Sequence, residues 1–490
     1  MPTKTLTSQT DRKGIQKTFK FGGGKNTVIA VDDGASSYGY IIDGGGGDDT
    51  IFGSEFAGFA GTGTNVDART LLGDLLIGGD GSDTVAGGDG EDTIYGGNED
   101  GSDASKGRNP PPTNLLVGDG GFDGSGALVD ALTVAADADV SASNDTIFGG
   151  NGATNTIYAD YNLITLSAGL PGTTTYTGGD DTATGGSDDG TVGATNTIYG
   201  DGNTVVLQAN TSFTGGGDTL TGGANSSNVI YGESFSANFS TNASFTGGND
   251  TLNGGDGGAG FFGQNFLYGD TRGISFSSAA GADGESFTGG NDTVTGGDGV
   301  SNSLHGDVQS ISNDGTFTGG NDTLTGGNNG AINAMIGDVL SGINVGNVTG
   351  GDDTLVSGTN ANDTMTGDFG NISSVAAPPA GADPYVVVGG ADTFVFATNN
   401  GQDTIKDFEA GKDKINLNAT GVTEAALDNF DTAGDLINGN DNFVTVTGTV
   451  AGGDAILEID LGAAAGGPGG INIVTIEGVE ELATGDFIFA

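Results

Sequence analysis

Phe287-Thr-Gly-Gly-Asn-Asp-Thr-Val-Thr295 is one of four nearly identical nonapeptides in the middle of this chain. The other three begin at Phe213, Phe245 and Phe317 and read FTGGGDTLT, FTGGNDTLN and FTGGNDTLT. Each copy places glycines before an aspartate and then a short apolar strand. A repeat of this kind predicts a coil that stacks on its own copies, because one copy alone cannot bury its apolar face.

Working outward from these nonapeptides, the repeat has two alternating forms between about residues 140 and 370. One form keeps the aspartate, and the other has asparagine before an apolar strand, as in Asn196-Thr-Ile-Tyr199. A short acid follows each asparagine form: Asp160, Asp201, Glu233, Asp270, Asp307 and Asp338. A third segment then alternates apolar and polar residues, as in Val205/Leu207 and Phe235/Phe239, which indicates a strand with one buried face.

The full period therefore comprises three short strands. It measures 30 residues from Asp292 to Asp322 and 42 from Asp250 to Asp292, and the extra length falls in the third segment. We expect an all-β fold, a parallel β-solenoid with an Asp corner, an Asn corner and a loop-bearing third side. A two-sided roll with inserted hairpins is the competing geometry.

Residues 41–97 contain nonapeptides of the form Gly-Gly-x-Gly-x-Asp-x-apolar-x. They span Gly44–Phe52, Gly78–Ala86 and Gly87–Tyr95, the last two in tandem. This pattern is the signature of calcium β-helices, and through it the chain resembles the RTX (repeats-in-toxin) family. The resemblance implies that backbone carbonyls of the glycine-rich turn and the Asp carboxylate bind Ca²⁺, and that the last three residues form a strand.

Residues 389–490 resemble the C-terminal cap and uncleaved type I secretion signal of RTX proteins. The matching elements are Asp392-Thr-Phe-Val-Phe396, Asp403-Thr-Ile-Lys-Asp-Phe408 and the terminal Asp486-Phe-Ile-Phe489. The resemblance implies secretion to the cell surface or beyond, as in bacterial surface-layer-like members. Such a segment, with its alternating hairpin after Ala455, is also expected to close the open edge of the solenoid.

The charge balance supports an external cation. Asp and Glu number 64 against 13 Lys and Arg, and the formal net charge is -51. So few basic residues cannot pair these acids, and stacked carboxylates about 4 Å apart repel by roughly 4 kcal/mol at an effective dielectric of 20. Hard divalent cations such as Ca²⁺ suit carboxylate and carbonyl oxygens. The candidate calcium ligands are Asp49, Asp83, Asp92, Asp145, Asp181, Asp218, Asp250, Asp292, Asp322, Asp353, Asp363, Asp392 and Asp403.

The Asn corner requires no such cation, because asparagine is neutral. Two interpretations remain open for it: stacked amides that hydrogen-bond along the axis, or asparagine tolerating a left-handed turn. Either way, calcium is expected on one edge of the middle solenoid and little on the other.

Residues 1–25 hold six of the 13 basic residues. This segment is either a frayed terminus or a cationic arm that docks on an acidic neighbour or an anionic cell-surface polysaccharide. The sequence thus divides into this arm (1–25), N-terminal repeats (26–139), long-period repeats (140–388) and the cap (389–490). No transmembrane segment and no cleavable signal peptide are expected, and the negative charge excludes nucleic acid as a partner.

These features favour a secreted, calcium-folded structural protein that assembles with itself into a surface layer, filament or matrix. The chain has no cysteine and one histidine, and its acids all lie in repeats, so we expect no enzyme activity. The alternatives are an adhesin or an ice- or polysaccharide-binding solenoid, suggested by Thr219/Thr221, Thr293/Thr295 and Thr323/Thr325. A polysaccharide-active enzyme with an acidic groove on the third face is a further alternative.

Overall fold

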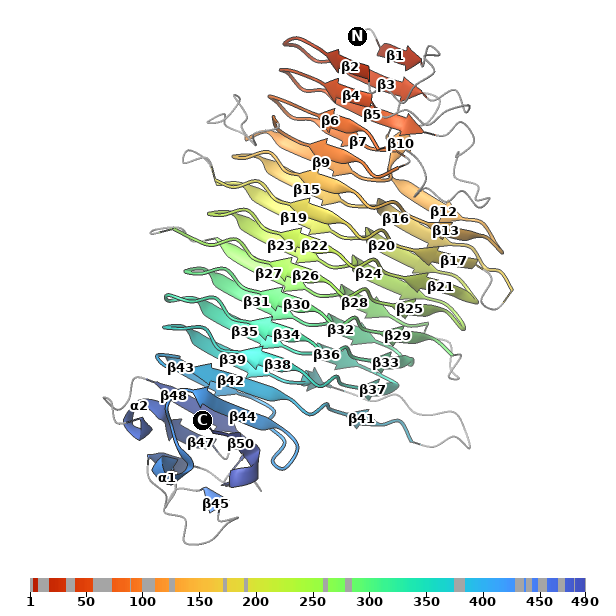
Figure 1. Ribbon diagram of the computed structural model, residues 1–490. Helices are drawn as coiled ribbons and strands as arrows, with labels where there is room; N and C mark the ends of the chain where they lie inside the picture. The colour runs from red at the N-terminus through yellow and green to blue at the C-terminus, as the bar shows by residue number, and fades with distance from the viewer. Residues whose placement is uncertain are drawn as a thin grey trace.

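The structure is a computed structural model that describes residues 3–7, 17–31, 40–55, 73–88, 90–98, 111–122, 128–170, 174–188, 193–258, 263–277, 284–373, 384–427, 436–437, 443–447, 456–465, 472–479 and 481–489. Over these residues the chain winds into short strands that stack in four long sheets along one axis (Figure 1). The predicted all-β parallel solenoid is therefore confirmed.

Two of these sheets run the length of the molecule. Sheet I contains, in spatial order, β1 (Thr3–Thr7), β3 (Thr27–Val31), β5 (Thr50–Glu55), β7 (Thr84–Ala86), β9 (Thr113–Val117), β15 (Thr154–Tyr158), β19 (Thr195–Tyr199), β23 (Ser227–Tyr231), β27 (Gln264–Tyr268), β31 (Ser301–His305), β35 (Ile332–Ile336), β39 (Asn362–Thr366), β43 (Gln402–Ile405), β48 (Ile473–Glu477), β47 (Ile456–Asp460) and β46 (Val444–Thr447). Sheet II contains β2 (Lys17–Lys20), β4 (Tyr40–Asp43), β6 (Leu75–Ile77), β8 (Thr93–Tyr95), β14 (Thr146–Phe148), β18 (Thr182–Thr184), β22 (Thr219–Thr221), β26 (Thr251–Asn253), β30 (Thr293–Thr295), β34 (Thr323–Thr325), β38 (Thr354–Val356), β42 (Thr393–Ala397), β44 (Lys414–Ala419) and β50 (Phe487–Ile488).

The other two sheets are confined to the middle of the chain. Sheet III contains β12 (Ala131–Val134), β16 (Tyr161–Leu166), β20 (Gly202–Leu207), β24 (Ser234–Phe239), β28 (Thr271–Ser275), β32 (Val308–Ser312), β36 (Val339–Ile343) and β40 (Phe369–Ile372). Sheet IV contains β13 (Asp139–Ser141), β17 (Thr174–Thr177), β21 (Thr211–Thr214), β25 (Ser244–Thr246), β29 (Ser286–Thr288), β33 (Thr316–Thr318), β37 (Asn347–Thr349) and β41 (Val387–Val388).

A coil of the middle region contains four strands rather than the three expected from the sequence. The chain passes from sheet IV to II, then to I, then to III, and returns to IV. The strand missing from that expectation is the Ser-Phe-Thr segment that precedes the glycines of the repeat. Ser286–Thr288 forms β29, with Phe287 buried between two more exposed polar residues. Among the described residues before β9, the strands belong to sheets I and II. These two sheets continue to the C-terminal strands, and the middle region adds a second pair of sheets to them.

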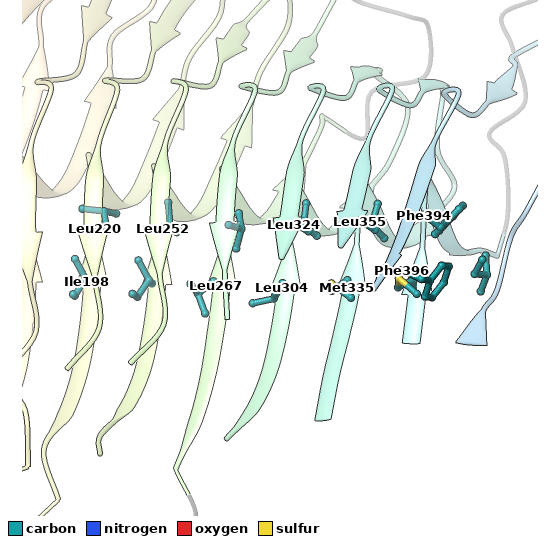
Figure 2. Packing of buried hydrophobic residues seen from close by; sticks show 14 of the residues in the cluster. Ile198, Leu220, Leu252, Leu267, Leu304, Leu324, Met335, Leu355, Phe394 and Phe396 are labelled. Carbon is teal, nitrogen blue, oxygen red and sulfur yellow. The ribbon is translucent and has the colours of Figure 1, made fainter. Parts of the chain in front are cut away.

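The two pairs of sheets enclose two separate cores. Sheets I and II face each other across rows of aliphatic side chains, among them Ile198, Leu220, Leu252 and Leu267 (Figure 2). We call this part the aliphatic half. Each fully buried side chain of this kind contributes roughly 1.5–3 kcal/mol.

Sheets III and IV enclose an aromatic core, and we call this part the aromatic half. Tyr176, Phe213, Phe245, Phe287 and Phe317 stack in one file with ring centroids 4.4–5.4 Å apart. Parallel strands lie about 4.8 Å apart, so identical positions in successive coils bring the rings to stacking distance. The period of the solenoid therefore dictates the aromatic geometry.

The C-terminal region caps one half only. Strand β43 pairs with β48, and β48, β47 and β46 form the predicted antiparallel hairpins at the end of sheet I. Sheet II continues through β44 to β50. The short helices α1 (Glu424–Leu427) and α2 (Leu461–Ala464) lie among these C-terminal strands in Figure 1, with α2 next to β48 of sheet I. Sheets III and IV end at β40 and β41, and no further strand of the described residues pairs with them.

The basic N-terminal segment takes part in the fold where the structure describes it. Strand β1 pairs with β3, and β2 pairs with β4, both in parallel. Lys20 forms an ion pair with Asp43, with Nζ 2.5 Å from Oδ2. The described parts of residues 1–25 are therefore the first strands of sheets I and II. None of the helices in the described ranges has the length and apolar character needed to cross a membrane.

Candidate metal centre

Two columns of buried acids run along the junction of the two halves, which we call the waist. The first, the Asp column, occupies the corner that leads into sheet II. Its members are Asp74, Asp92, Asp145, Asp181, Asp218, Asp250, Asp292, Asp322, Asp353, Asp392 and Asp413, all of them buried. The second, the opposing column, occupies the corner that leads from sheet I to sheet III and contains Asp119, Asp160, Asp201, Glu233, Asp270, Asp307, Asp338 and Asp368.

The Asp column is a continuous hydrogen-bonded ladder. In each step one carboxylate oxygen accepts the backbone N–H of the aspartate one coil earlier, at 2.5–3.0 Å; Asp322 thus accepts from Asp292, and Asp292 from Asp250. Aspartate suits this position because its short carboxylate reaches the backbone of the neighbouring coil from a tight glycine corner. Each Oδ1 is therefore held in place by the fold.

The second oxygen of most carboxylates in the Asp column has no hydrogen-bond partner. This holds for the Oδ2 atoms of Asp92, Asp145, Asp181, Asp218, Asp250, Asp292, Asp322, Asp353 and Asp392. In the opposing column it holds for Asp160 Oδ1, Glu233 Oε2 and Asp338 Oδ2, and outside the two columns it holds for Asp49 Oδ2. A buried charged oxygen without a partner is costly, so a repeated row of them indicates a missing counter-charge.

The opposing column faces the glycine corners of the Asp column. Gly290 N–H donates to both oxygens of Asp270 at 3.2 Å, and Gly320 N–H donates to those of Asp307 at 3.2 and 3.1 Å. These acids therefore join the corner at which each coil enters the aromatic half, between sheets I and III, to the corner at which it leaves, between sheets IV and II.

Glycine is required at the waist because backbone and carboxylate approach closely. A Cβ on Gly289 would lie 1.7 Å from Asp307 Oδ1, and one on Gly306 would lie 2.0 Å from Asp322 Oδ2. The second contact shows that the unpartnered oxygen of the Asp column points at the backbone of the opposing column. The carboxylates of the two columns therefore interdigitate.

Burial raises the pKa of these carboxyl groups, and neighbouring acids raise it further. The pKa of Asp292 lies well above its usual range, first through burial and then through Asp270, Asp250 and Asp322. Burial is also the main cause for Asp160, whose pKa rises to about 8, and for Asp392, whose pKa rises to about 9. Without a cation these groups would have to hold protons at neutral pH, whereas a bound cation favours the charged form.

The available donors fit a hard cation held by few side chains and several backbone oxygens. No group of three or more His, Cys, Asp or Glu able to share one ion is found among the described residues. The corner carbonyls stack along the axis: a Cβ on Gly320 would lie 1.4 Å from the carbonyl oxygen of Gly290. One or two carboxylates with such carbonyl oxygens form a ligand set suited to Ca²⁺.

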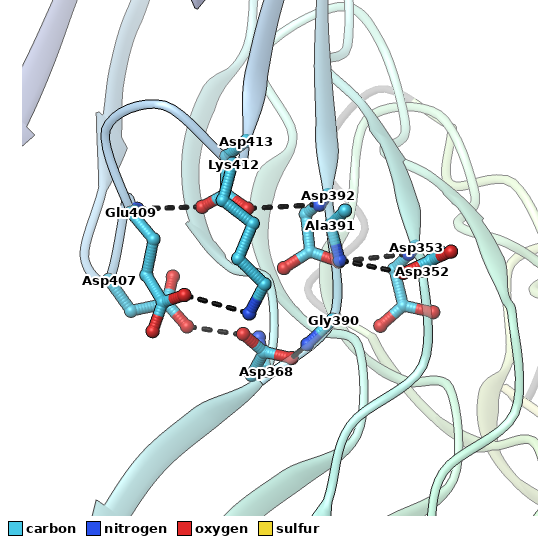
Figure 3. A network of polar contacts seen from close by, with 10 residues as sticks. All are labelled: Asp352, Asp353, Asp368, Gly390, Ala391, Asp392, Asp407, Glu409, Lys412 and Asp413. Carbon is cyan, nitrogen blue, oxygen red and sulfur yellow. Dashed lines mark hydrogen bonds and ion pairs between the residues drawn. The ribbon is translucent and has the colours of Figure 1, made fainter. Parts of the chain in front are cut away.

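A basic side chain lies close to the waist at its C-terminal end (Figure 3). Asp392 N–H donates to Asp413 Oδ1 at 3.0 Å, which completes the Asp column. Lys412 pairs with Glu409, its Nζ 2.7 Å from Oε2, and its charge also lowers the pKa of Asp368, which burial raises to about 7. Lys412 thus offsets only part of the effect of burial on Asp368, the last acid of the opposing column, whose pKa remains raised.

The candidate ligands separate onto two edges. Asp92, Asp145, Asp181, Asp218, Asp250, Asp292, Asp322, Asp353 and Asp392 lie in the Asp column. Asp49, Asp83, Asp363 and Asp403 lie at the other corner, which leads into sheet I. Asp363 accepts from Asn333 and Asp403 accepts from Asn400 and Ser357, so these two carboxylates are hydrogen-bonded already.

The corner that leads into sheet I carries the amide ladder that was one of our two interpretations. From Asn114 through Asn155, Asn196, Asn228, Asn265, Asn302 and Asn333, each Nδ2 donates to the Oδ1 of the next coil at 2.7–3.1 Å. The left-handed residues at this corner are different ones, Asn225, Asn329 and Asn360, with φ of 51°, 60° and 53°. The ladder satisfies its own buried groups without a cation.

The opposing column, Asp74 and Asp413 were absent from our predicted ligands. The sequence contained the signal, an acid after every asparagine strand, but held no indication of its partner. Asp270 and Gly290 meet only because two further strands lie between them and return the chain to the waist.

Comparisons of this chain with protein-family models, curated proteins and solved structures found no match.

Proposed function

We propose that this protein is a secreted structural protein that folds on Ca²⁺ and assembles with itself into an extracellular surface layer, filament or matrix. The observation that carries the proposal is the waist, where buried carboxylate oxygens without hydrogen-bond partners recur in coil after coil. The proposal includes no catalytic activity.

The chain lacks the cations needed to neutralise the waist. Between positions 109 and 405 its only Lys or Arg is Arg272. The ion pairs among the described residues lie outside this stretch: Lys20–Asp43, Lys406–Glu477 and Lys412–Glu409. In this proposal external cations offset the buried charge, and metal binding of this kind contributes directly to the free energy of folding.

The resemblance to RTX proteins suggests why folding would depend on calcium. A chain that stays unfolded at low calcium suits export in an extended form, and calcium-rich surroundings would then fold it outside the cell. The glycine-rich nonapeptides and the C-terminal elements support this route.

The ends of the aromatic half support self-assembly. Strand β41 is the last of sheet IV and has one unpaired edge among the described strands. Val386, Val387 and Val388 are 57%, 36% and 48% exposed there. An open edge with exposed apolar side chains favours pairing with another chain, and a contact between different surfaces of two copies can propagate into a filament or layer.

Circular dichroism during a calcium titration, followed by electron microscopy of the same sample, tests the proposal. We expect a coil-to-β transition on adding Ca²⁺ and ordered assemblies in the folded sample. Protein that is fully folded at neutral pH in calcium-depleted buffer would contradict the calcium-dependent folding. Folded protein that stays monomeric at millimolar calcium would contradict the assembly.

A second candidate function, an ice- or surface-binding adhesin, is favoured by a flat threonine array. Thr182, Thr219, Thr251, Thr293 and Thr323 are in register on the outer face of sheet II, and all five are exposed. A second column, two residues on, holds Thr184, Thr221, Asn253, Thr295 and Thr325. Thermal hysteresis of the folded protein would support ice binding if Thr293→Leu abolishes it; hysteresis equal to that of buffer would exclude it.

A further inference from the structure

A hollow of about 350 Å³ opens on the outer face of sheet III, away from the waist. Phe235, Arg272 and Gln309 line it from the same position of three successive strands, β24, β28 and β32. Asn238, Gly273 and Ser310 also line the hollow. We expected Phe235 to pair with Phe239 on the buried face, but Phe239 is buried whereas Phe235 turns outward and is 37% exposed.

The hollow holds the one cation of the long acidic stretch. Arg272 lies over the ring of Phe235, with Cζ 4.9 Å from the ring centroid. Its Nε donates to Gln309 Oε1 at 2.7 Å. None of the ion pairs of the described residues includes Arg272, and the residues around the hollow include no acid. A positioned guanidinium without a carboxylate partner is a ready binder of an anionic group.

The open space depends on Gly273. In the register of sheet III, Gly273 lies between Ser236 and Ser310. A Cβ at Gly273 would meet Ser310 Oγ at 3.4 Å and Phe235 O at 4.0 Å, which are ordinary contacts. Packing therefore does not require glycine here, unlike at Gly289 in the waist. The missing side chain leaves the hollow open beside the guanidinium.

We infer that this hollow binds a uronate residue of an acidic polysaccharide. The carboxylate would bind the remaining N–H groups of Arg272, and the exposed ring of Phe235 offers an apolar wall to one face of the sugar. Asn238, Gln309 and Ser310 supply amide and hydroxyl groups for sugar hydroxyls.

The proposed binding uses no carboxylate of the waist and no residue of strand β41, because the residues that line the hollow all belong to sheet III. The test is isothermal titration calorimetry of the full-length folded protein with trigalacturonate, at the same calcium concentration in cell and syringe. Maltotriose serves as the neutral sugar and inorganic phosphate as the simple anion. The variants are Arg272→Gln, which removes the charge, and Gly273→Val, which fills the space and keeps the charge. Thr165→Val, on the outer face of β16 two strands before β24, is the matched control outside the hollow.

We expect trigalacturonate to bind and maltotriose and phosphate to bind far more weakly. Arg272→Gln and Gly273→Val should each weaken binding by about tenfold or more, while Thr165→Val changes it by less than about twofold. All three variants should give the circular dichroism spectrum of the parent. Absence of binding, equal binding of maltotriose or phosphate, or binding unchanged in both hollow variants would overturn the inference.

Discussion

Replacing Asp292 by asparagine should have opposite effects on stability with and without calcium. Asp292 is buried in the Asp column, and its neighbours in the adjacent coils are Asp250 and Asp322. In the Asp292→Asn variant the amide oxygen can still accept the N–H of Asp250, now 2.7 Å from Oδ1. The substitution therefore removes the charge and retains the ladder.

The magnitude follows from the spacing of the coils. Neighbouring carboxylates of the column lie one coil apart, about 4.8 Å, and two such charges repel by roughly 3 kcal/mol at an effective dielectric of 20. We expect the variant to be more stable than the parent by about this amount in calcium-depleted buffer above pH 4.5, so that its circular dichroism signal is lost at a higher pH than that of the parent. In saturating calcium it should be less stable, and its calcium titration midpoint should be higher, because a ligand oxygen is lost.

The stability difference between variant and parent should disappear in acid, where Asp292 is protonated. The pKa of Asp292 is raised in the folded, cation-free protein, so the group is protonated and harmless in acid and costs stability as pH rises. The free energies of unfolding of variant and parent, measured by urea denaturation in calcium-depleted buffer, should agree within about 0.5 kcal/mol at pH 4.5. Asp256→Asn is the matched control, because Asp256 is exposed and also accepts a backbone N–H, from Asp298 at 2.9 Å. If Asp292→Asn destabilises the protein equally with and without calcium, repulsion between the carboxylates of the waist does not control its stability.

Three further predictions follow from the same structure. In calcium-depleted buffer the parent protein should be folded near pH 4.5 and lose its circular dichroism signal as pH rises, because burial raises the pKa of Asp160 to about 8 and of Asp392 to about 9; a fold that is lost on acidification instead would contradict the sign. Asn302→Ala should destabilise the protein by about 2–4 kcal/mol in urea denaturation, equally in calcium at neutral pH and in calcium-depleted buffer at pH 4.5, because it leaves buried partners of the amide ladder unsatisfied. Phe287→Ala should cost about 3–5 kcal/mol by opening the aromatic core, whereas its exposed neighbour Thr288→Ala should change stability by less than about 0.5 kcal/mol, and equal losses in the two variants would argue against the stacked core.

Much of the fold could be predicted from the repeat itself. Identical segments at a regular period favour parallel stacking, because each residue then meets its own copy in the next coil. The difference between Asp218 and Asn228 also distinguished a charged corner from a neutral one, and the hydrogen-bonded amides of the neutral corner confirm one of the two interpretations made for it.

The number of strands in a coil could not be predicted in the same way. Ser-Phe-Thr is three residues long, and next to two glycines it is as compatible with a turn as with a strand. Only pairing with its copies in neighbouring coils makes it strand β29, because the hydrogen bonds that define a strand in a parallel sheet come from other coils.

The sequence by itself determined the period, the stacking and the positions of the acids. The tertiary structure alone decided which acids meet. Asp49 and Asp92 have the same local motif, yet successive nonapeptides of a two-sided roll lie on opposite edges, so Asp49 lies at the corner of the amide ladder and Asp92 lies in the Asp column. Asp270 comes to face Gly290 only because the intervening chain forms β28 and β29 and returns. Local sequence sets the conformation of a corner, but contact between two corners depends on the path of the whole coil.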